Sequence, residues 1–194
     1  MPLIYFSRHG QTDWNAGQRM QGHLDIPLND IGRRQAARNG AAIAEVIDDV
    51  SRFDFVSSPL VRASETMEIM RDAMGLELAG YRTDPHLREI HMGDWQGGHY
   101  PKLVHEYPAQ FQAREADPWN FLYPGEGAES YAVFSARVLD WFSGITLDTI
   151  VTSHGGVMRC LRGHLLGLDG RDTVKLDVPQ DKVLRIVDGT LEWV

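Results

Sequence analysis

Short apolar runs and longer helical patterns alternate along this chain. Apolar runs bounded by glycine or by polar residues predict buried strands at residues 3–6, 53–56 and 149–153. Between them, apolar residues recur every three or four positions, which is the spacing of a helix with one buried face. Strands that alternate with helices favour a mostly parallel central sheet covered on both faces. The expected fold class is therefore a three-layer α/β/α arrangement.

Capping residues predict where the helices begin. Asn29 and Asp30 can cap a helix whose apolar and small stripe is Ile31, Ala36, Ala37, Gly40, Ala41, Ile43, Ala44 and Ile47. Pro59 follows two serines, which predicts the first turn of a second helix. The buried face expected for that helix is Leu60, Ala63, Met67, Met70 and Met74. Further helices are predicted at about 128–142 and 157–166, and two late strands at 174–176 and 183–187.

Residues 85–127 break this regular pattern. Glycine and proline recur through the segment, at Gly93, Gly97, Gly98, Pro101, Pro108, Pro118, Pro124 and Gly125. We expect an irregular, lid-like excursion over the top of the sheet, with one or two short helices. No linker, repeat or low-complexity tract interrupts the rest of the chain, so residues 1–194 are predicted to form a single domain.

Length and composition are those of one globular domain, since the chain has 194 residues of which 43% are hydrophobic. No apolar stretch approaches the roughly 18 residues of a membrane span. The first apolar run reaches Arg8 too soon for a signal peptide. The only cysteine, Cys160, lies in an apolar helical stretch, which suits an inert core thiol in a reducing compartment. We therefore expect a cytoplasmic protein.

The net charge of −8 bears on the possible partners. Nucleic acids and anionic membranes are bound nonspecifically through positive surfaces, so the sequence predicts no nucleic acid and no membrane as a partner. A small anionic substrate is compatible with this charge, because its binding depends on local cations. The sequence leaves open whether the chain forms a homo-oligomer.

Two of the predicted strands end in the same dipeptide. Residues 3–6 lead into Arg8, His9 and Gly10, and residues 149–153 lead into His154 and a glycine. Ligands of open α/β sheets bind outside the carboxyl ends of the strands, so His9 and His154 stand where chemistry is expected. A histidine considered alone is more often structural. Neutral imidazole is nevertheless a competent nucleophile near pH 7.

Arg62 gives an independent indication of an anion. It falls in the first turn of the helix after Pro59, where the helix dipole disfavours a cation by about 0.3–1 kcal/mol. Either the side chain is solvated, or an anion lies at that helix start, drawn by free amides and the guanidinium. With Arg8 as a second guanidinium, the histidines and arginines would suit a phosphoryl group. Glu89 is assigned partly by elimination, because a leaving alkoxide needs an acid and an attacking water needs a base.

The ordered set of motifs resembles a known family. Its segments are residues 8–15 (RHGQTDWN), 19–28 (RMQGHLDIPL), 58–66 (SPLVRASET), 87–97, 124–130 and 153–156 (SHGG). In this order they closely resemble the histidine phosphatase superfamily, which includes the cofactor-dependent phosphoglycerate mutases. Arg-His-Gly alone is a weak motif, but the ordered segments together are specific. The resemblance extends from Leu3 to about Ile186 and implies a phosphoglycerate mutase-like fold.

The resemblance implies a catalytic role for each of five residues. His9 would be phosphorylated transiently, and Glu89 would donate the proton. Arg8, Arg62 and His154 would bind the phosphoryl oxygens. The implied mechanism uses no metal and no cofactor, and the implied partner is a small phosphorylated substrate.

The resemblance also implies a set of residues that bind the substrate. Asn15 matches a further position that contacts phosphate, and Gln21 and Gly22 match a segment that lines the pocket. Thr12 and Gly155 complete this expected binding set.

Residues 90–126 bear on the choice between phosphatase and mutase. Mutases that this chain resembles carry a longer insertion with a tandem arginine pair, whereas this segment offers only Lys102 and Arg114. The segment is instead rich in aromatic residues, at Trp95, Tyr100, Tyr107, Phe111, Trp119, Phe121 and Tyr123. Such residues more often serve packing than substrate contact, but an aromatic lid suits release of phosphate from an organic monoester. We therefore predict a phosphatase, with phosphoglycerate mutase activity as the alternative.

Two other function classes stay open. A noncatalytic phosphoprotein-binding module would not need a nucleophile or an acid, so retention of His9 and Glu89 argues against it. A metal hydrolase would use His9, His154 and another of the eight histidines, but the sequence lacks a spaced ligand cluster such as His-Glu-x-x-His.

Overall fold

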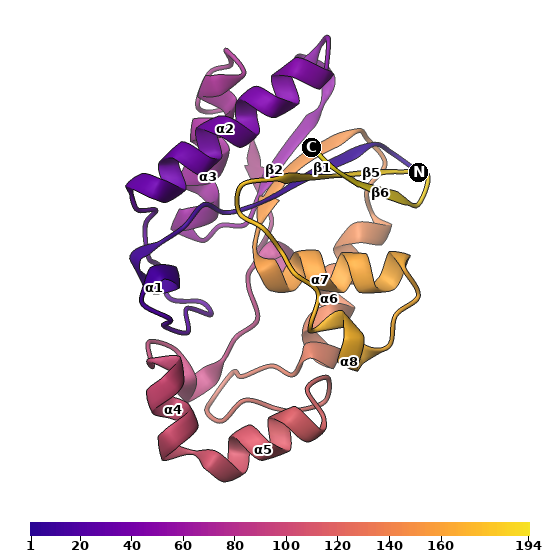
Figure 1. The fold of residues 1–194 in the computed structure, drawn as a ribbon. Helices are drawn as coiled ribbons and strands as arrows, with labels where there is room; N and C mark the ends of the chain where they lie inside the picture. Colours follow the sequence, from indigo (N-terminus) through magenta and orange to yellow (C-terminus); the bar gives the residue numbers. More distant parts are fainter.

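The computed structural model describes residues 1–194 and contains one six-stranded sheet in the order β3-β2-β4-β1-β5-β6 (Figure 1). The first four strands in this order are parallel to one another; β5 runs antiparallel to β1, and β6 runs antiparallel to β5. The strands are β1 (Ile4–Arg8), β2 (Asp54–Ser57), β3 (Arg82–Thr83), β4 (Thr149–Ser153), β5 (Val183–Val187) and β6 (Thr190–Trp193). The mostly parallel sheet predicted from the sequence is confirmed.

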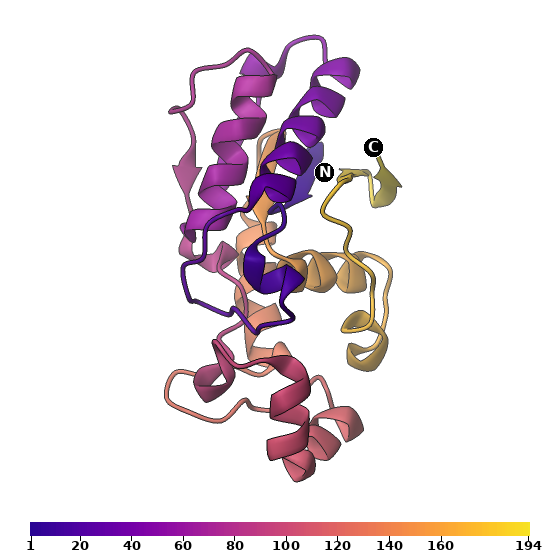
Figure 2. The same cartoon turned by 60° about the vertical axis from the view of Figure 1, so that its left-hand side comes forward.

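The fold has three layers, with helices on both faces of the sheet. A hydrophobic cluster lies on each face, between the sheet and the helices that cover it. Successive residues of a strand point to opposite faces, so Ile4 and Phe6 join one cluster while Tyr5 joins the other. Helices α2 (Asp30–Val46) and α3 (Val61–Ala73) lie side by side against the face that carries Tyr5 (Figures 1 and 2). The other face is covered by α6 (Tyr131–Ser143) and α7 (Gly155–Leu165). No helix is long and apolar enough to cross a membrane.

Helix α2 begins where the sequence predicts, but its buried stripe is narrower. The Asn29 side chain caps the helix by accepting from the amide of Gly32 at 2.9 Å. Gly32 packs so closely on Gln11 that a Cβ would overlap the Gln11 carbonyl oxygen. That contact fixes the rotation of the helix and turns Ile31, predicted on the buried stripe, outward with 45% of its surface exposed. Two further residues predicted on that stripe are also exposed, namely Ala41 and Ala44.

Helix α3 begins two residues later than Pro59 suggests. Leu60 occupies the N-cap position without a side-chain hydrogen bond, and Arg62 is the second helical residue. Its expected buried face is confirmed for Ala63, Met67 and Met70, and Met74 at the end of the helix is only partly buried.

The excursion between β3 and α6 contains the two expected short helices, α4 (Tyr100–Glu106) and α5 (Pro108–Ala116) (Figure 1). It is built around its own aromatic core. Trp95 is 1% exposed and stacks on Phe111 with ring centroids 4.3 Å apart, while Phe121 and Tyr123 pack around the same indole. The short elements not yet named are α1 (Asp13–Ala16), α8 (Gly170–Thr173) and the 3-10 turns Val50–Arg52, Pro85–Leu87 and Gly93–Trp95.

The strand predicted at residues 174–176 is wrong. Those residues follow α8 as a turn and a loop, and the carbonyl of Leu176 accepts from the Arg159 side chain at 2.8 Å instead of joining a sheet. The strand that the sequence analysis missed is β6, which forms a hairpin with β5. Its turn contains Asp188 and Gly189, both with positive φ, and an Asp-Gly pair is a strong hairpin signal.

Candidate active site

The register of the sheet brings the two histidines together. Arg8 at the end of β1 pairs with Ser153 at the end of β4, so the next residue of each strand leaves the same edge at neighbouring positions. These residues are His9 and His154, whose ring centroids lie 5.2 Å apart with an edge-to-face geometry. His9 is 3% exposed and His154 is fully buried.

A cavity of about 200 Å³ opens at this edge. Its lining residues are Arg8, His9, Asn15, Arg19, Met20, Gln21, Gly22, Arg62, Glu89, Met92 and Arg159. Most of the residues predicted for the site therefore share one cavity. The three predicted residues that do not line it are Thr12, His154 and Gly155.

The hydrogen bond of His9 indicates which ring nitrogen carries the proton. Its Nδ1 lies 2.7 Å from the carbonyl oxygen of Gly10, and a carbonyl can only accept, so Nδ1 donates. The lone pair of a neutral ring is then on Nε2. Burial lowers the pKa of His9 well below 6.5, and the nearby cations Arg62 and Arg8 lower it further. His9 is therefore neutral at pH 7.

Arg8 and Arg62 present guanidinium groups that the protein satisfies only in part. Arg8 donates to the carbonyl of Val178 at 2.7 Å, and Arg62 donates to the carbonyls of Leu24 and Gly22 at 2.8 Å each. The Nε atom of each is buried without a partner. Burial lowers the pKa of Arg62 to about 10, so it stays a cation at neutral pH. Two desolvated cations with unused donors form an anion site.

Glu89 reaches the site from the first part of the excursion. Its carboxylate accepts from the amide of Ile90 at 2.9 Å and from the amide of Gly156 at 3.2 Å. A Cβ on Gly156 would overlap Oε1 of Glu89, so the second glycine after His154 is required for this approach. The carboxylate is half-buried and is the only acidic group that lines the cavity.

His154 packs behind His9 and is held by Ser58. Its Nε2 lies 2.8 Å from the Ser58 hydroxyl, and its Nδ1 is buried without a partner. Burial, and then the charge of Arg62, lower the pKa of His154 well below 6.5. The ring is therefore neutral and has one nitrogen free for a further contact.

Thr12 holds two of the predicted binding residues, Asn15 and Gln21, through hydrogen bonds. It is fully buried and caps α1, where its backbone amide donates to Asn15 Oδ1 at 3.1 Å and its hydroxyl donates to Gln21 Oε1 at 3.0 Å. Gly22 has a positive φ of 52°, and a Cβ there would overlap the side chain of Gln96. Gly155 begins α7 beside the Arg8 guanidinium.

The sequence analysis missed Arg159, Arg19, Met20 and Met92 as lining residues. Arg159 donates through Nε to the carbonyl of Leu176 at 2.8 Å. Burial is the largest cause that lowers the pKa of Arg8; the charge of Glu89 raises that pKa, and the charge of Arg159 lowers it. Arg159 lies four residues after Gly155, about one helical turn, and this spacing was a usable signal.

The aromatic lid expected from residues 90–126 does not line this cavity. Met92 is the only residue of that segment in its wall, because the aromatic side chains pack on one another. Lys102 pairs with Glu106 at 3.6 Å, and Arg114 donates to the hydroxyl of Tyr123 at 3.2 Å. Neither cation of the segment lies in the wall.

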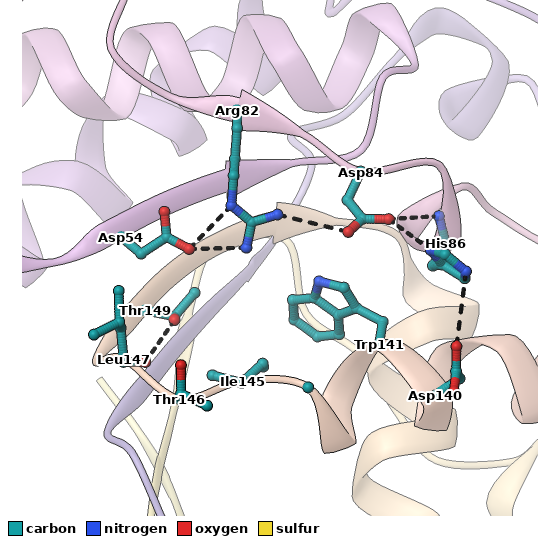
Figure 3. Close-up of a pocket in the computed structure, with 11 residues that line it drawn as sticks. Asp54, Arg82, Asp84, His86, Asp140, Trp141, Ile145, Thr146, Leu147 and Thr149 are labelled. Carbon is teal, nitrogen blue, oxygen red and sulfur yellow. Dashed lines mark hydrogen bonds and ion pairs between the residues drawn. The ribbon is translucent and has the colours of Figure 1, made fainter.

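A larger cavity of about 480 Å³ lies elsewhere, beside the starts of β2 and β3 (Figure 3). Its arginine and histidine side chains are engaged by neighbouring carboxylates. Arg82 contacts Asp54 at 2.8 Å and Asp84 at 3.6 Å, and His86 lies 2.8 Å from Asp84. The chain contains no group of three or more His, Cys, Asp or Glu side chains placed to hold a metal ion.

Known proteins resemble this chain over most of its length. A family model described as histidine phosphatase superfamily (branch 1) matches residues 4–190. Phosphoglycerate mutase-like protein 4 of Arabidopsis thaliana is 37% identical over 166 residues, which are 81% of this chain and 68% of that protein. Glucosyl-3-phosphoglycerate phosphatase of Mycolicibacterium vanbaalenii is 36% identical over 170 residues, which are 83% of this chain and 72% of that protein.

Solved structures show the same architecture. A mycobacterial glucosyl-3-phosphoglycerate phosphatase in complex with VO3 has a TM-score of 0.76 and 28% identity, and covers 100% of this chain and 96% of its own. The protein YhfR of Bacillus stearothermophilus has a TM-score of 0.80 and 26% identity, and covers 100% of this chain and 95% of its own. These matches confirm the predicted fold class and family resemblance. The chain belongs to the histidine phosphatase superfamily (branch 1) and is an enzyme of that family.

Proposed function

We propose that this enzyme hydrolyses small organic phosphomonoesters through a phosphohistidine at His9. The observation that carries the proposal is the state of His9, a buried neutral imidazole whose proton is held on Nδ1 by Gly10. Its Nε2 lone pair stands in a cavity walled by Arg8 and Arg62. A nucleophile beside two guanidinium groups is suited to attack on a phosphoryl group, whose negative charge the cations stabilise.

In the first step Nε2 of His9 attacks phosphorus. The P–N bond forms as the ester P–O bond breaks, and Glu89 gives its proton to the leaving oxygen, so that an alcohol departs. The ring gains a positive charge as it becomes phosphorylated. The Nδ1–H bond to the Gly10 carbonyl, 2.7 Å long, stabilises that charge.

In the second step water attacks the phosphohistidine. Glu89, now a carboxylate, takes a proton from the water as the P–N bond breaks, which returns neutral His9 and releases inorganic phosphate. Glu89 ends the cycle protonated and ready for another ester. The guanidinium groups of Arg8 and Arg62 hold the phosphoryl oxygens through both steps. His154, which does not line the cavity, packs edge-to-face on His9 and helps to keep that ring in place.

The choice of hydrolysis over mutase activity rests on the cations of residues 90–126. A mutase must hold the rest of a phosphoglycerate while the phosphate moves between its hydroxyls. The two cations of residues 90–126, Lys102 and Arg114, are engaged elsewhere and do not line the cavity. Phosphatases and phosphoglycerate mutase-like proteins both occur among the relatives, so the activity assay below includes both outcomes.

The cellular compartment that we propose, the cytoplasm, follows from Cys160. It is the only cysteine and is buried, and burial raises its pKa to about 12, which makes the thiol unreactive. This suits a reducing cytoplasm, where phosphorylated metabolites are available as substrates. We expect the reaction to need no added metal or cofactor.

The test is a screen for phosphate release over many phosphomonoesters, with the His9→Ala variant as the blank. The wild-type enzyme should release phosphate and should acquire acid-labile phosphate from labelled substrate. His9→Ala should do neither, whereas His105→Ala, which changes an exposed histidine of α4, should do both. Full activity in His9→Ala would refute the nucleophile. Conversion of 3-phosphoglycerate without release of phosphate would replace hydrolysis by mutase activity.

A further inference from the structure

The side chain of Arg137 holds the segment that carries Glu89. Arg137 lies on α6, outside the cavity wall, and its guanidinium has five N–H groups. Nη1 donates to the carbonyls of His86 and Arg88 at 2.7 and 2.9 Å, and Nη2 donates to the carbonyl of Glu89 at 2.9 Å. Three carbonyls within four residues of chain therefore converge on one guanidinium.

The two remaining N–H groups of Arg137 bind Glu129. Nε donates to Oε1 at 2.8 Å and Nη2 donates to Oε2 at 2.9 Å, which makes the pair bidentate. Glu129 in turn accepts from the amide of His91 at 2.8 Å, and its own amide donates to the His91 carbonyl at 2.9 Å. All five donors of Arg137 are thus used. Arg137 and Glu129, called the clamp below, hold the backbone before Glu89 at His86 and Arg88 and after it at His91.

Contacts with other side chains also hold the start and the centre of the segment. Before it, Asp84 accepts from the amide of His86 at 2.9 Å and lies 2.8 Å from the His86 ring (Figure 3). At its centre, His23 Nε2 lies 2.7 Å from the Glu89 carbonyl, which therefore accepts from two side chains. The backbone of Glu89 is thus held in place, and its carboxylate accepts hydrogen bonds from the amides of Ile90 and Gly156.

We propose that Arg137, together with Glu129, is a positioning residue that fixes the backbone of Glu89 so that its carboxyl group stands at the leaving-group oxygen. The proposal rests on the role of Glu89 as the acid in the proposed function. Proton transfer requires donor and acceptor within hydrogen-bond reach, and a displacement of about 1 Å can cost about 10²-fold in rate. Residues 88–92 form an irregular loop between two 3-10 turns, so the hydrogen bonds of Arg137 supply the fixed backbone that a longer helix or strand would provide.

The chemistry of the clamp requires arginine. Lysine carries three donors from a single atom and cannot bind a carboxylate and three carbonyls in one plane. The ion pair is also shielded, with 21% of the Arg137 side chain and 15% of the Glu129 side chain exposed. Loss of either partner leaves a poorly solvated charge, so both variants should loosen the segment.

The test compares two substrates that differ in their need for an acid. p-Nitrophenyl phosphate has a good leaving group, and glycerol phosphate has a poor one. We expect Arg137→Ala to lower kcat/KM for glycerol phosphate by about 10²-fold and to lower it much less for p-nitrophenyl phosphate. kcat/KM reports the steps up to departure of the alcohol, so water attack does not enter the comparison. Arg137→Lys and Glu129→Gln should lie between wild type and Arg137→Ala.

Two controls separate positioning from loss of fold. Inhibition by vanadate should be unchanged in every variant, because the phosphoryl site does not involve Arg137. The matched variant Arg185→Ala removes a different ion-paired arginine, which contacts Glu192 at 2.7 Å on the C-terminal hairpin. It should leave the ratio of the two kcat/KM values as in wild type. If Arg137→Ala fails to fold, Arg137→Lys and Glu129→Gln carry the same comparison.

Glu89→Gln distinguishes failure of this inference from failure of the proposed function. If Glu89→Gln lowers kcat/KM equally for both substrates, Glu89 is not the acid, and the proposed function is wrong in that step. If Glu89→Gln is selective for the poor leaving group but the Arg137 and Glu129 variants are not, the clamp does not position the acid. In the Glu89→Gln background Arg137→Ala should cost little more, because both changes remove one function. An additive loss in the double variant would overturn the inference.

Discussion

Replacing Gly156 with alanine places a methyl group where the Glu89 carboxylate lies. The new Cβ would overlap Glu89 Oε1 and would come within 2.8 Å of Cε1 and 3.1 Å of Cζ of Phe134. Phe134 is fully buried on α6 and has little room to move. The carboxylate is the more mobile of the two neighbours, so it should be displaced and should lose its hydrogen bond to the Gly156 amide.

The size of the effect can be worked out from these contacts. Overpacking in a well-packed region costs about 1–3 kcal/mol. Alanine gains up to about 1 kcal/mol over glycine in a helix, which leaves a net loss of stability of about 0–2 kcal/mol. The effect on catalysis is larger, since displacement of the acid by about 1 Å should lower kcat/KM for glycerol phosphate by about 10²-fold.

The preceding glycine supplies a matched comparison. A Cβ on Gly155 would lie 3.4 Å from Arg8 Nε and 3.6 Å from Arg159 Nη1, which are ordinary contacts. Gly155→Ala therefore keeps the helix gain without the clash and should lose far less activity than Gly156→Ala. Both variants would be assayed with glycerol phosphate and by urea denaturation. Equal activity in the two variants would refute the position assigned to the Glu89 carboxylate.

Three other predictions follow from the core, the cavity wall and the buried histidines. Trp95→Ala should lower the free energy of unfolding, measured in urea, by about 3–5 kcal/mol, because the indole is 1% exposed and stacked on Phe111. Trp95→Phe should cost less than about 1.5 kcal/mol, since the indole N–H has no hydrogen-bond partner to lose. Arg159→Ala should weaken competitive inhibition by inorganic phosphate about tenfold, a loss of about 1.4 kcal/mol, and unchanged inhibition would remove Arg159 from the anion site. The pKa values of His9 and His154 lie well below 6.5 in the folded chain, first because of burial and then because of nearby cations, so below about pH 6.5 the unfolded chain binds more protons. The free energy of unfolding should therefore fall as pH drops from 7.5 to 5.5, and His154→Gln should show a shallower fall.

The centre of the site could be predicted from the sequence because it depends on strand ends. Two apolar runs that each finish in His-Gly need only be adjacent and parallel for their histidines to meet, and the pairing of Arg8 with Ser153 provides this. Arg62 could be predicted for a similar reason, since its place in the first turn of a helix follows from local signals. Glu89 lacks such a signal, so the sequence assigns it only partly by elimination, and the family resemblance implies the same role.

The remaining parts of the site depend on contacts between distant segments. Arg137 lies 48 positions after Glu89, beyond helices α4 and α5, and nothing in the spacing of polar residues indicates that they meet. The apolar alternation at residues 174–176 resembles a strand, whereas in the structure these residues form a loop and the carbonyl of Leu176 accepts from the Arg159 side chain. For the aromatic residues of the excursion the sequence favours packing over substrate contact, which the stacking of Trp95 on Phe111 bears out, but the expected lid over the site is wrong because composition does not reveal which neighbours a ring has.

The charge of the site has a consequence for stability as well as for binding. The chain carries a net charge of −8, yet its cavity wall holds four arginines and one carboxylate. Charges on the outer surface are screened beyond about 8 Å at physiological salt, so a substrate inside the cavity responds mainly to the buried guanidinium groups. Burial lowers the pKa of Arg8 and Arg62, which means that the folded enzyme holds these charges at a cost. A bound phosphoryl group supplies the missing anion and the missing hydrogen-bond acceptors, and it therefore stabilises the fold through the same contacts by which it is recognised.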